Sequence, residues 1–357
     1  MPESPVRVLH VANSLGLGGT EKVMQLFAAH LDRTRFLPAV YSPVDGERAA
    51  LIRAAGVETH IGGDLFGVLG RFNPRIVHLH RAGWPQPDLL QPLIRARTPV
   101  VVETNVFGRH DPSSHARIID RTLFVSRFCL ERFERETGIA AEPPRYSFLH
   151  NPVDTDSLAA DARPDRDFSR PAIARLSRPD PGKWSRLALD ILPLLVRDVP
   201  GFRCHIVGAT PEARAFVHEQ GLESAVVFHD PVRTDAEIAA FLDNASLLAH
   251  ANDTGESFGL AIAEAMACGL PVVTHPAMGD RDNAQLELVE QGVTGLVAAS
   301  AEEYAGAVRH LLTHPEEARR MGLAGQAKAA RLFRAQTVTR QLERIYEELL
   351  ELKGISR

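Results

Sequence analysis

Cysteine and long apolar runs are scarce in this 357-residue chain. The three cysteines, Cys129, Cys204 and Cys268, lie far apart and form no C-x-x-C pair, which argues against a disulfide framework or a structural zinc site. No uninterrupted apolar run reaches the roughly 18 residues of a membrane-spanning helix. Arg7 interrupts the early apolar run, so we expect no signal peptide. The expected location is the cytosol, with peripheral contact at the inner face of the membrane left open.

Excess charge of either sign is also missing. Forty Lys and Arg residues stand against 45 Asp and Glu residues, which gives a net charge of −5. This balance provides no general attraction for nucleic acid or an anionic membrane, so we expect no nucleic-acid partner. Only four of the 40 basic residues are lysines, and a lysine in a suitable place therefore carries more weight than an arginine.

Short β-branched runs alternate with longer helical patterns along almost the whole chain. This alternation predicts an α/β fold with parallel sheets and helices on both faces. We assign residues 1–151 to a first domain and 171–335 to a second. Residues 152–170, with five Asp and two Pro, read as a linker. The last segment, 336–357, is a helix that packs either on the first domain or on the second.

The stretch HANDTGESFGLAIAEAMACGLPVV, residues 250–273, is the most informative. A predicted strand ends in a polar loop, and Gly259 then opens a helix. The first amides of a helix lack internal partners and its dipole is positive there, so this turn suits a diphosphate. Glu264 lies about 7.5 Å along the helix axis, a suitable place for bonds to a ribose. The turn consists of Ser257, Phe258, Gly259 and Leu260.

The segment ESFGLAIAE resembles the E-x7-E motif of retaining glycosyltransferases of the GT-B fold, particularly family 4, the glycosyl transferases group 1. Without that resemblance, Glu256 and Glu264 would be an ordinary loop acid and a helix-surface acid. The S-F-G-L turn and the A-C-G-L-P-V-V exit favour the functional interpretation. The resemblance implies two Rossmann-like domains whose parallel sheets face an interdomain cleft. It places Glu256 beside the donor sugar as an orienting and electrostatic group.

Two cations of the second domain resemble the family's clamp on the donor diphosphate. In AIARLSRPDPGKWS they are Arg175 and Lys183. They lie eight residues apart, a longer interval than is usual in the family, and Arg178 is an alternative to one of them. Fixed cations would stabilise the negative charge of the departing diphosphate. The alternative interpretation is a solvated basic loop.

Three weaker signals complete the predicted donor site. The glycine-rich NSLGLGGTEK resembles the family's first loop, in which the amides of Gly18 and Gly19 approach the donor; alternatively, it is a helix entry capped by Thr20. Backbone near Asp230 and Val232 is expected to flank the base. The loop 279–283 is expected to close over the donor sugar.

The acceptor side is less readable. His78 and His80 share one face of a predicted strand, but we find no third ligand at helical spacing and expect no metal. His80, near the strand's carboxyl end, is an acceptor-side candidate. Many family members place a histidine at the end of the strand that corresponds to residues 99–104. Here that position is Glu103, so either Glu103 or His110 takes the role, or the acceptor differs.

The resemblance implies a retaining, metal-independent glycosyltransferase, and we expect no cofactor. Its donor would be a nucleotide diphosphate sugar, with UDP favoured because UDP-sugars are the commonest donors of the family. Its acceptor would be a hydroxyl group of a saccharide, a lipid-linked saccharide or a small molecule. Two alternatives stay open: a sugar-nucleotide epimerase or hydrolase of the same fold, and a catalytically silent partner subunit.

Overall fold

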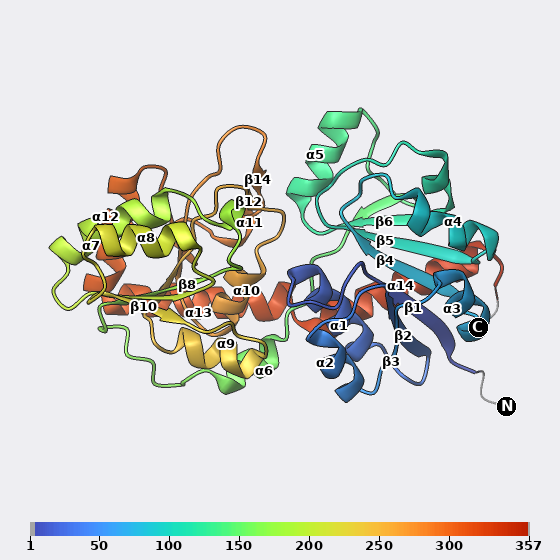
Figure 1. Cartoon of the computed structure of the whole chain (residues 1–357), viewed down its shortest axis with the longest axis horizontal. Helices are drawn as coiled ribbons and strands as arrows, with labels where there is room; N and C mark the ends of the chain where they lie inside the picture. The colour runs from blue at the N-terminus through green and yellow to red at the C-terminus, as the bar shows by residue number, and fades with distance from the viewer. Residues whose placement is uncertain (1–3, 356–357) are drawn as a thin grey trace. The chain divides into compact units, whose positions relative to one another are not determined.

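The computed structural model describes residues 4–355 and divides into two compact units. The first unit contains the chain up to Pro152 together with the chain from Ala335 onward, and the second contains Val153–Arg334. Each unit is built around one parallel sheet with helices packed against it (Figure 1). The α/β fold class expected from the sequence is confirmed.

The sheet of the first unit has seven parallel strands in the order β3-β2-β1-β4-β5-β6-β7. The order reverses direction between β1 and β4, which is where doubly wound sheets bind ligands, at the carboxyl ends of the strands. Val100, Val101 and Val102 of β5 are all fully buried, as expected for a strand covered on both faces. The strands are β1 Val6–Val11, β2 Phe36–Ser42, β3 Glu58–Ile61, β4 Ile76–Arg81, β5 Val100–Asn105, β6 Arg121–Phe124 and β7 Tyr146–Phe148.

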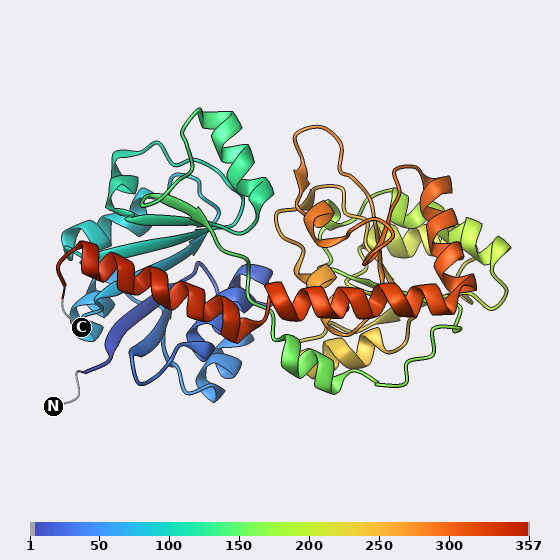
Figure 2. The same cartoon turned by 180° about the vertical axis from the view of Figure 1, so that it is seen from behind.

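The helices of this unit include the last helix of the chain, α14, which crosses one face of the sheet and lies in front of it in Figure 2. Glu343 accepts a hydrogen bond from the backbone of Asp32 at 2.7 Å, and the Tyr346 ring lies edge-on to Phe36. The helix thus covers an apolar face of the first sheet. The helices are α1 Gly19–His30, α2 Arg48–Ala54, α3 Leu65–Phe72, α4 Pro87–Arg95, the 3-10 helix η1 Ser114–Ile118, α5 Arg127–Thr137 and α14 Ala335–Leu352.

The second unit repeats the topology in a six-stranded parallel sheet of order β10-β9-β8-β11-β13-β15. A separate two-stranded sheet pairs Glu256 of β12 with Asn283 of β14. Two distant loops are therefore tied together at the predicted donor site. The strands are β8 Ala172–Leu176, β9 Arg203–Val207, β10 Val226–His229, β11 Leu247–Ala249, β12 Gly255–Glu256, β13 Val272–Thr274, β14 Asp282–Asn283 and β15 Gly295–Val297.

The segment predicted as a linker contains a helix, α6, and belongs to the second unit. Asp154 caps α6 by accepting from the amide of Ser157, so one of the aspartates that suggested a linker is a helix cap. Its length of seven residues left too little apolar periodicity to read. The helices are α6 Thr155–Asp161, η2 Pro181–Lys183, α7 Leu187–Asp198, α8 Pro211–Glu219, α9 Asp235–Leu242, α10 Leu260–Ala267, α11 Gln285–Leu288, α12 Ala301–Thr313 and α13 Pro315–Leu332.

Among residues 4–355, no helix combines the length and the apolar composition that crossing a bilayer requires.

Candidate functional site

Glu256 lies at the centre of a polar cluster in the second unit. One carboxylate oxygen is 3.0 Å from Lys183 Nζ, and the other lies 3.2 Å from His250 Nε2. The second oxygen also accepts a hydrogen bond from the side-chain amide of Asn252. Gln285 accepts a bond from the Glu256 amide at 3.1 Å. Both carboxylate oxygens are thus fixed by neighbours that stabilise negative charge.

The charge state of Glu256 follows from these neighbours. Burial raises the pKa of the carboxyl, but Lys183 and then His250 outweigh it and lower the pKa to about 2. The pKa of His250 is lowered by burial, which the Glu256 carboxylate only partly offsets. At neutral pH the cluster therefore holds a carboxylate, an ammonium and a neutral imidazole. The Lys183 side chain is 25% exposed, so its ammonium can also reach an anion in solution.

Arg175 does not point toward solvent as a clamp residue would. The residue is only 3% exposed, and its guanidinium lies 4.2 Å from the centre of the Trp184 ring. One of its nitrogens donates to the backbone carbonyl of Lys183, and that nitrogen also lies 3.3 Å from Asn252 Oδ1. Burial lowers the pKa of Arg175 to about 10, so it remains a cation at neutral pH. Through its bond to the Lys183 carbonyl, it fixes the loop that carries Lys183, called the lysine loop below.

The long interval between Arg175 and Lys183 has a structural explanation. The chain forms the 3-10 helix η2, capped by the Asp180 carboxylate accepting from Gly182, and this turn carries Lys183 back over the end of β8. Arg178 in the same loop is 60% exposed and lies 3.9 Å from Asp180. Of the two arginines, Arg178 is the solvent-accessible one, as the alternative interpretation of the sequence allowed.

The predicted phosphate turn precedes α10 as expected, but its side chains have different roles. Gly259 is the N-cap residue with a φ of +102°, a conformation that glycine adopts without strain. Phe258 is 3% exposed and lies edge-on to Phe333, 5.2 Å between ring centres, so it belongs to the core. Ser257 donates to the Asp282 carboxylate across the two-stranded sheet. Backbone amides at the start of α10, including that of Leu260, are therefore the groups suited to an anion.

Glu264 lies within α10 and is 5% exposed, so it is not the surface acid that an ordinary helix position would give. Glutamate is seldom buried to this extent, and acids in a protein interior are normally paired. Asp230 and Val232 lie in the loop that follows β10, exposed and half-buried respectively. Both positions lie beyond the carboxyl end of a parallel strand, the edge at which ligands bind.

The loop between β13 and α11 is organised by Asn283. Its side chain accepts from the Ala277 amide at 2.8 Å and donates to the Ala277 carbonyl at 3.0 Å. Gln285 donates to the carbonyl of His275 at 3.0 Å. The tip between these anchors includes Met278, which is 77% exposed. The loop therefore has a fixed base and an exposed tip.

The glycine-rich loop of the first unit leads directly into α1. Gly18 is the N-cap and Gly19 the first helical residue, so Thr20 lies inside the helix and is not the cap. A Cβ at Gly18 would lie 2.1 Å from the Glu21 carboxylate, which Ser14 also contacts at 2.8 Å. That oxygen is the far end of a flexible side chain, so a larger residue at Gly18 would displace the Glu21 carboxylate.

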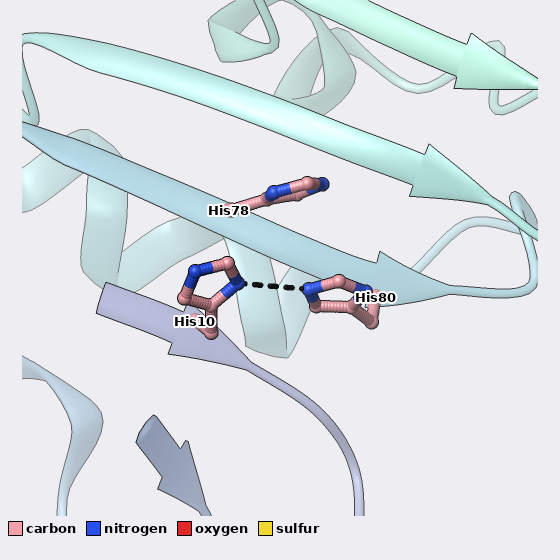
Figure 3. Close-up of side chains that lie close together, drawn as sticks. All are labelled: His10, His78 and His80. Atoms are coloured by element: carbon pink, nitrogen blue, oxygen red, sulfur yellow. Dashed lines mark hydrogen bonds between the residues drawn. The ribbon is translucent and has the colours of Figure 1, made fainter. Parts of the chain in front are cut away.

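Three histidines cluster in the first unit, where only two were expected (Figure 3). His10 of β1 lies beside His78 and His80 of β4, and one ligand atom from each lies within 4.8 Å of the others. The search for a third ligand at helical spacing missed His10, because it comes from a neighbouring strand. His10 Nδ1 is 3.1 Å from His80 Nε2 (Figure 3). This spacing suits a transition metal, which neutral imidazoles bind.

Ring nitrogens of this cluster also have partners within the protein. His78 uses both ring nitrogens, one 2.6 Å from the Tyr346 hydroxyl and the other 2.8 Å from Thr104 Oγ1. Burial, followed by Arg33, lowers the pKa of His10 to about 3, and burial holds the pKa values of His78 and His80 well below the usual value. The rings are neutral, and the His80 ring stacks on both His10 and His78. The expectation of no metal stays a prediction.

Glu103 is enclosed in the first sheet. The residue is 3% exposed, one oxygen lies 2.8 Å from Arg81 Nε, and Thr122 donates to the other at 2.9 Å. Burial raises the pKa of Glu103, although Arg81 and Thr122 act in the opposite direction. His110, the other candidate for this role, is exposed and lies edge-on to Phe133. Of the two, His110 is the side chain that solvent reaches.

A recess of about 550 Å³ lies between α4 and η1. Arg97, Thr98 and Pro99 line it, and these residues precede β5. It therefore lies at the amino-terminal edge of the sheet, opposite the edge at which doubly wound folds bind ligands.

Sequence reasoning missed the side chains that hold Glu256. Asn252 and His250 occupy the polar loop directly after β11, and Gln285 follows β14. The first two were detectable as polar residues at a strand end in the predicted motif. Gln285 was not, since its contact joins positions 29 residues apart.

Comparison with known proteins points to the same region. Residues 170–314 match the sequence model of the family described as "Glycosyl transferases group 1". This range includes Arg175, Lys183, Glu256 and the start of α10.

Two curated relatives share about a third of their aligned residues with the chain. A GDP-mannose-dependent alpha-(1-6)-phosphatidylinositol monomannoside mannosyltransferase of Mycolicibacterium smegmatis is 31% identical over 226 residues, which is 58% of this chain and 56% of the relative. A D-inositol 3-phosphate glycosyltransferase of Segniliparus rotundus is 31% identical over 288 residues, which is 72% of this chain and 62% of the relative. The chain thus spans less than two thirds of either relative.

Solved structures match over nearly the whole chain. Anabaena HepE in complex with UDP and glucose superposes with a TM-score of 0.78 at 20% identity, covering 96% of this chain and 99% of HepE. Sucrose-phosphate synthase of Thermosynechococcus elongatus gives a TM-score of 0.71 at 18% identity, covering 97% and 100%. At these identities the likeness shows the fold, two Rossmann-like domains in the GT-B architecture.

Proposed function

Because the chain belongs to the family-4-like glycosyltransferases of the GT-B fold, we propose that it transfers a sugar from a nucleotide diphosphate donor to a hydroxyl acceptor. The observation that carries the proposal is the cluster around Glu256. A carboxylate with both oxygens fixed lies 3.0 Å from a partly exposed lysine, close in sequence to the positive end of a helix. This combination suits a sugar whose bond to a diphosphate is breaking.

Charge neutralisation in this mechanism comes from the protein. As the sugar–phosphate bond breaks, the diphosphate gains negative charge, which Lys183 and the first amides of α10 stabilise. Arg175 keeps the lysine loop in place, and Arg178 is the accessible second cation. Glu256 orients the sugar and supports positive charge at its anomeric carbon. We propose retention of configuration and no essential divalent metal, as the family resemblance implies.

The donor nucleotide is proposed to be UDP, the commonest in the family, with GDP as the second candidate. The specific observation that favours GDP is the mannosyltransferase relative, whose name includes GDP-mannose as donor. The acceptor is proposed to be a hydroxyl group of a saccharide, a lipid-linked saccharide or a cyclitol. The inositol-containing names of both relatives support the last two. We also propose that the enzyme acts in the cytosol. With a lipid-linked acceptor it would contact the inner face of the membrane peripherally.

A thermal-shift screen against UDP-, GDP-, ADP- and TDP-sugars tests the donor, because a ligand that binds the native state raises its apparent stability. We expect a UDP-sugar to give the largest shift. A larger shift with GDP-mannose would replace UDP by GDP, and no shift with any nucleotide sugar would contradict the function itself.

Product analysis with the selected donor separates transfer from the alternatives. Transfer to an added acceptor supports the proposal, whereas epimerised or hydrolysed donor without transfer favours the other enzymes of this fold. Activity that a chelator abolishes and added metal restores would contradict metal independence.

A further inference from the structure

Two aromatic side chains stand exposed together at one end of the first sheet. Trp84 is 52% exposed and Phe107 is 36% exposed, and their ring centres lie 5.5 Å apart at an angle of 38°. Tryptophan is usually buried for most of its surface, so leaving half of it in water forgoes favourable free energy. Paired exposed aromatic rings are typical of binding surfaces.

The backbone beneath Trp84 is held rigidly. Arg81, whose side chain is 0% exposed, donates to the Trp84 carbonyl at 2.6 Å. The same guanidinium lies 2.8 Å from Glu103 and 3.0 Å from Asp111. Moving the Trp84 loop would separate this buried arginine from its acidic partners, which is costly because it leaves an uncompensated charge in the interior. The loop is therefore held in one conformation.

The loop of Phe107 is fixed in a similar way. The buried Arg132 donates to the Phe107 carbonyl, and Gly108 packs so closely that a Cβ there would lie 2.5 Å from the Cys129 carbonyl oxygen. Asn105 closes the turn by donating to the Arg109 carbonyl at 2.7 Å and accepting from its amide at 3.2 Å. Both rings are thus presented by loops that are ordered before any ligand arrives, which lowers the entropic cost of binding.

The pair lies at the edge where this fold binds ligands. β4 and β5 are neighbours in the sheet, and their last residues, Arg81 and Asn105, are paired in register (Figure 1). Trp84 and Phe107 follow these two strand ends within three residues. The carboxyl ends of strands next to the reversal of strand order are the ligand-binding edge of a doubly wound sheet.

We propose that Trp84 and Phe107 form a platform on which the ring of the acceptor stacks, and that this acceptor is a pyranose or a cyclitol. The faces of such rings carry C–H groups, and the negative face of an aromatic ring attracts their partial positive charge. The inference rests on the proposed transferase function only in naming the bound ring as the acceptor. It also gives Glu103 a role, because this residue positions Arg81 and thereby the Trp84 loop.

A membrane surface is the competing occupant, and local charge argues against it. Segments that bind anionic membranes combine aromatic residues with clusters of Lys and Arg. Residues 82–90 contain no Lys or Arg and include Asp88. In the second loop, Arg109 is paired with Glu136 at 3.0 Å.

The test uses the fluorescence of Trp84 in the full chain, since the other tryptophan, Trp184, is buried. Methyl α-D-mannopyranoside, methyl β-D-glucopyranoside and myo-inositol serve as cyclic probes. Sorbitol, which carries similar hydroxyl groups on an open chain, is the control probe. We expect at least one cyclic probe to give a saturable change in emission and sorbitol to give none. No saturable change with any cyclic probe, or an equal change with sorbitol, would overturn the proposal.

Variants sharpen the assignment. Phe107→Ala is expected to weaken binding of the responding probe about tenfold, the scale of an aromatic anchor at a binding site. In transfer assays Trp84→Ala should raise the acceptor KM by a similar factor, and Trp84→Phe should restore most of it, with the donor KM unchanged. Leu323→Ala, which shortens another exposed apolar side chain in the second unit, is the matched control. Unchanged acceptor KM in Trp84→Ala and Phe107→Ala would contradict the platform.

Two further outcomes are distinguishable. If wild-type protein transfers no sugar from any nucleotide donor but the fluorescence titration saturates, the transferase function fails and the ring-binding platform stands. If wild-type protein sediments with vesicles of phosphatidylcholine and phosphatidylglycerol and Trp84→Ala does not, while the cyclic probes leave the emission unchanged, the pair is a membrane contact and the platform is rejected.

Discussion

Glu256 and Glu103 are both enclosed acids near the carboxyl ends of parallel strands, one in each unit, yet their surroundings differ. The Glu256 side chain is 14% exposed and its ammonium partner, Lys183, is 25% exposed. The Glu103 side chain is 3% exposed and its partner Arg81 is fully buried. The pKa of Glu256 is lowered to about 2, whereas burial raises that of Glu103.

The difference favours Glu256 as the acid that contacts a ligand and Glu103 as an acid with a structural role. When a substrate replaces one member of a solvent-accessible ion pair, the displaced charged group can be hydrated or can bind the substrate itself. Such a pair can therefore open at low cost. A fully buried pair cannot, since separating its members leaves an uncompensated charge in the interior. We therefore assign Glu256 to the donor site and Glu103 to positioning of the acceptor loop.

The largest expected effect is on catalysis. Glu256→Gln keeps the shape of the side chain but removes its charge, and we expect kcat to fall about 100- to 1,000-fold, the range found when one preorganised electrostatic group is removed. Initial rates of transfer with saturating donor measure it. Glu351→Gln, on the exposed side of α14, is the matched control. A variant within tenfold of wild type would remove Glu256 from the reaction.

Glu103→Gln should act on stability first. It leaves Arg81 with one acidic partner, and we expect a loss of about 3 kcal/mol in the free energy of unfolding of the first unit. Denaturant unfolding monitored by circular dichroism measures the loss. Calorimetry should show unchanged donor affinity, because Glu256 and Lys183, to which we assign the donor contact, lie in the second unit. A stable variant with weakened donor binding would reverse the comparison between the two acids.

Lys183→Ala should weaken binding of UDP about tenfold or more, since a charge-assisted contact to phosphate is lost. Isothermal titration calorimetry measures the affinity. Lys353→Ala removes another paired lysine, 2.7 Å from Asp120, and is expected to leave it unchanged. Equal affinities of the Lys183 variant and wild type would contradict the diphosphate contact.

The smallest expected effect is a loss of stability at acidic pH. Burial lowers the pKa of His10 to about 3, so between pH 6.5 and 4 the unfolded chain binds a proton there that the folded chain does not. Stability must therefore fall as the pH falls through this window, by about 1 kcal/mol per pH unit for this residue. Urea unfolding between pH 7 and 5 measures the slope, and His10→Asn should reduce it. An unchanged slope would show that His10 is protonated in the folded state.

Much of the local arrangement at the candidate donor site was predictable from the sequence. Glu256, Gly259 and Glu264 lie within nine residues of one another, and the residues of α10 are joined by local hydrogen bonds. A short motif therefore specifies their arrangement, and the strand–helix alternation specifies parallel sheets because apolar β-branched runs must be covered on both faces. The succession of strands and helices along the chain followed from the same alternation.

Other features depended on pairing between distant segments. His10 meets His78 because β1 and β4 are neighbours, and Phe107 meets Trp84 because β5 follows β4 in the sheet. Arg175 is a supporting residue, and not an exposed clamp, because its guanidinium packs on Trp184. Residue type and spacing along one element determined which side chains were candidates for contacting a diphosphate. Only the tertiary structure decided which of them reach solvent, since burial depends on what the other strands and helices cover.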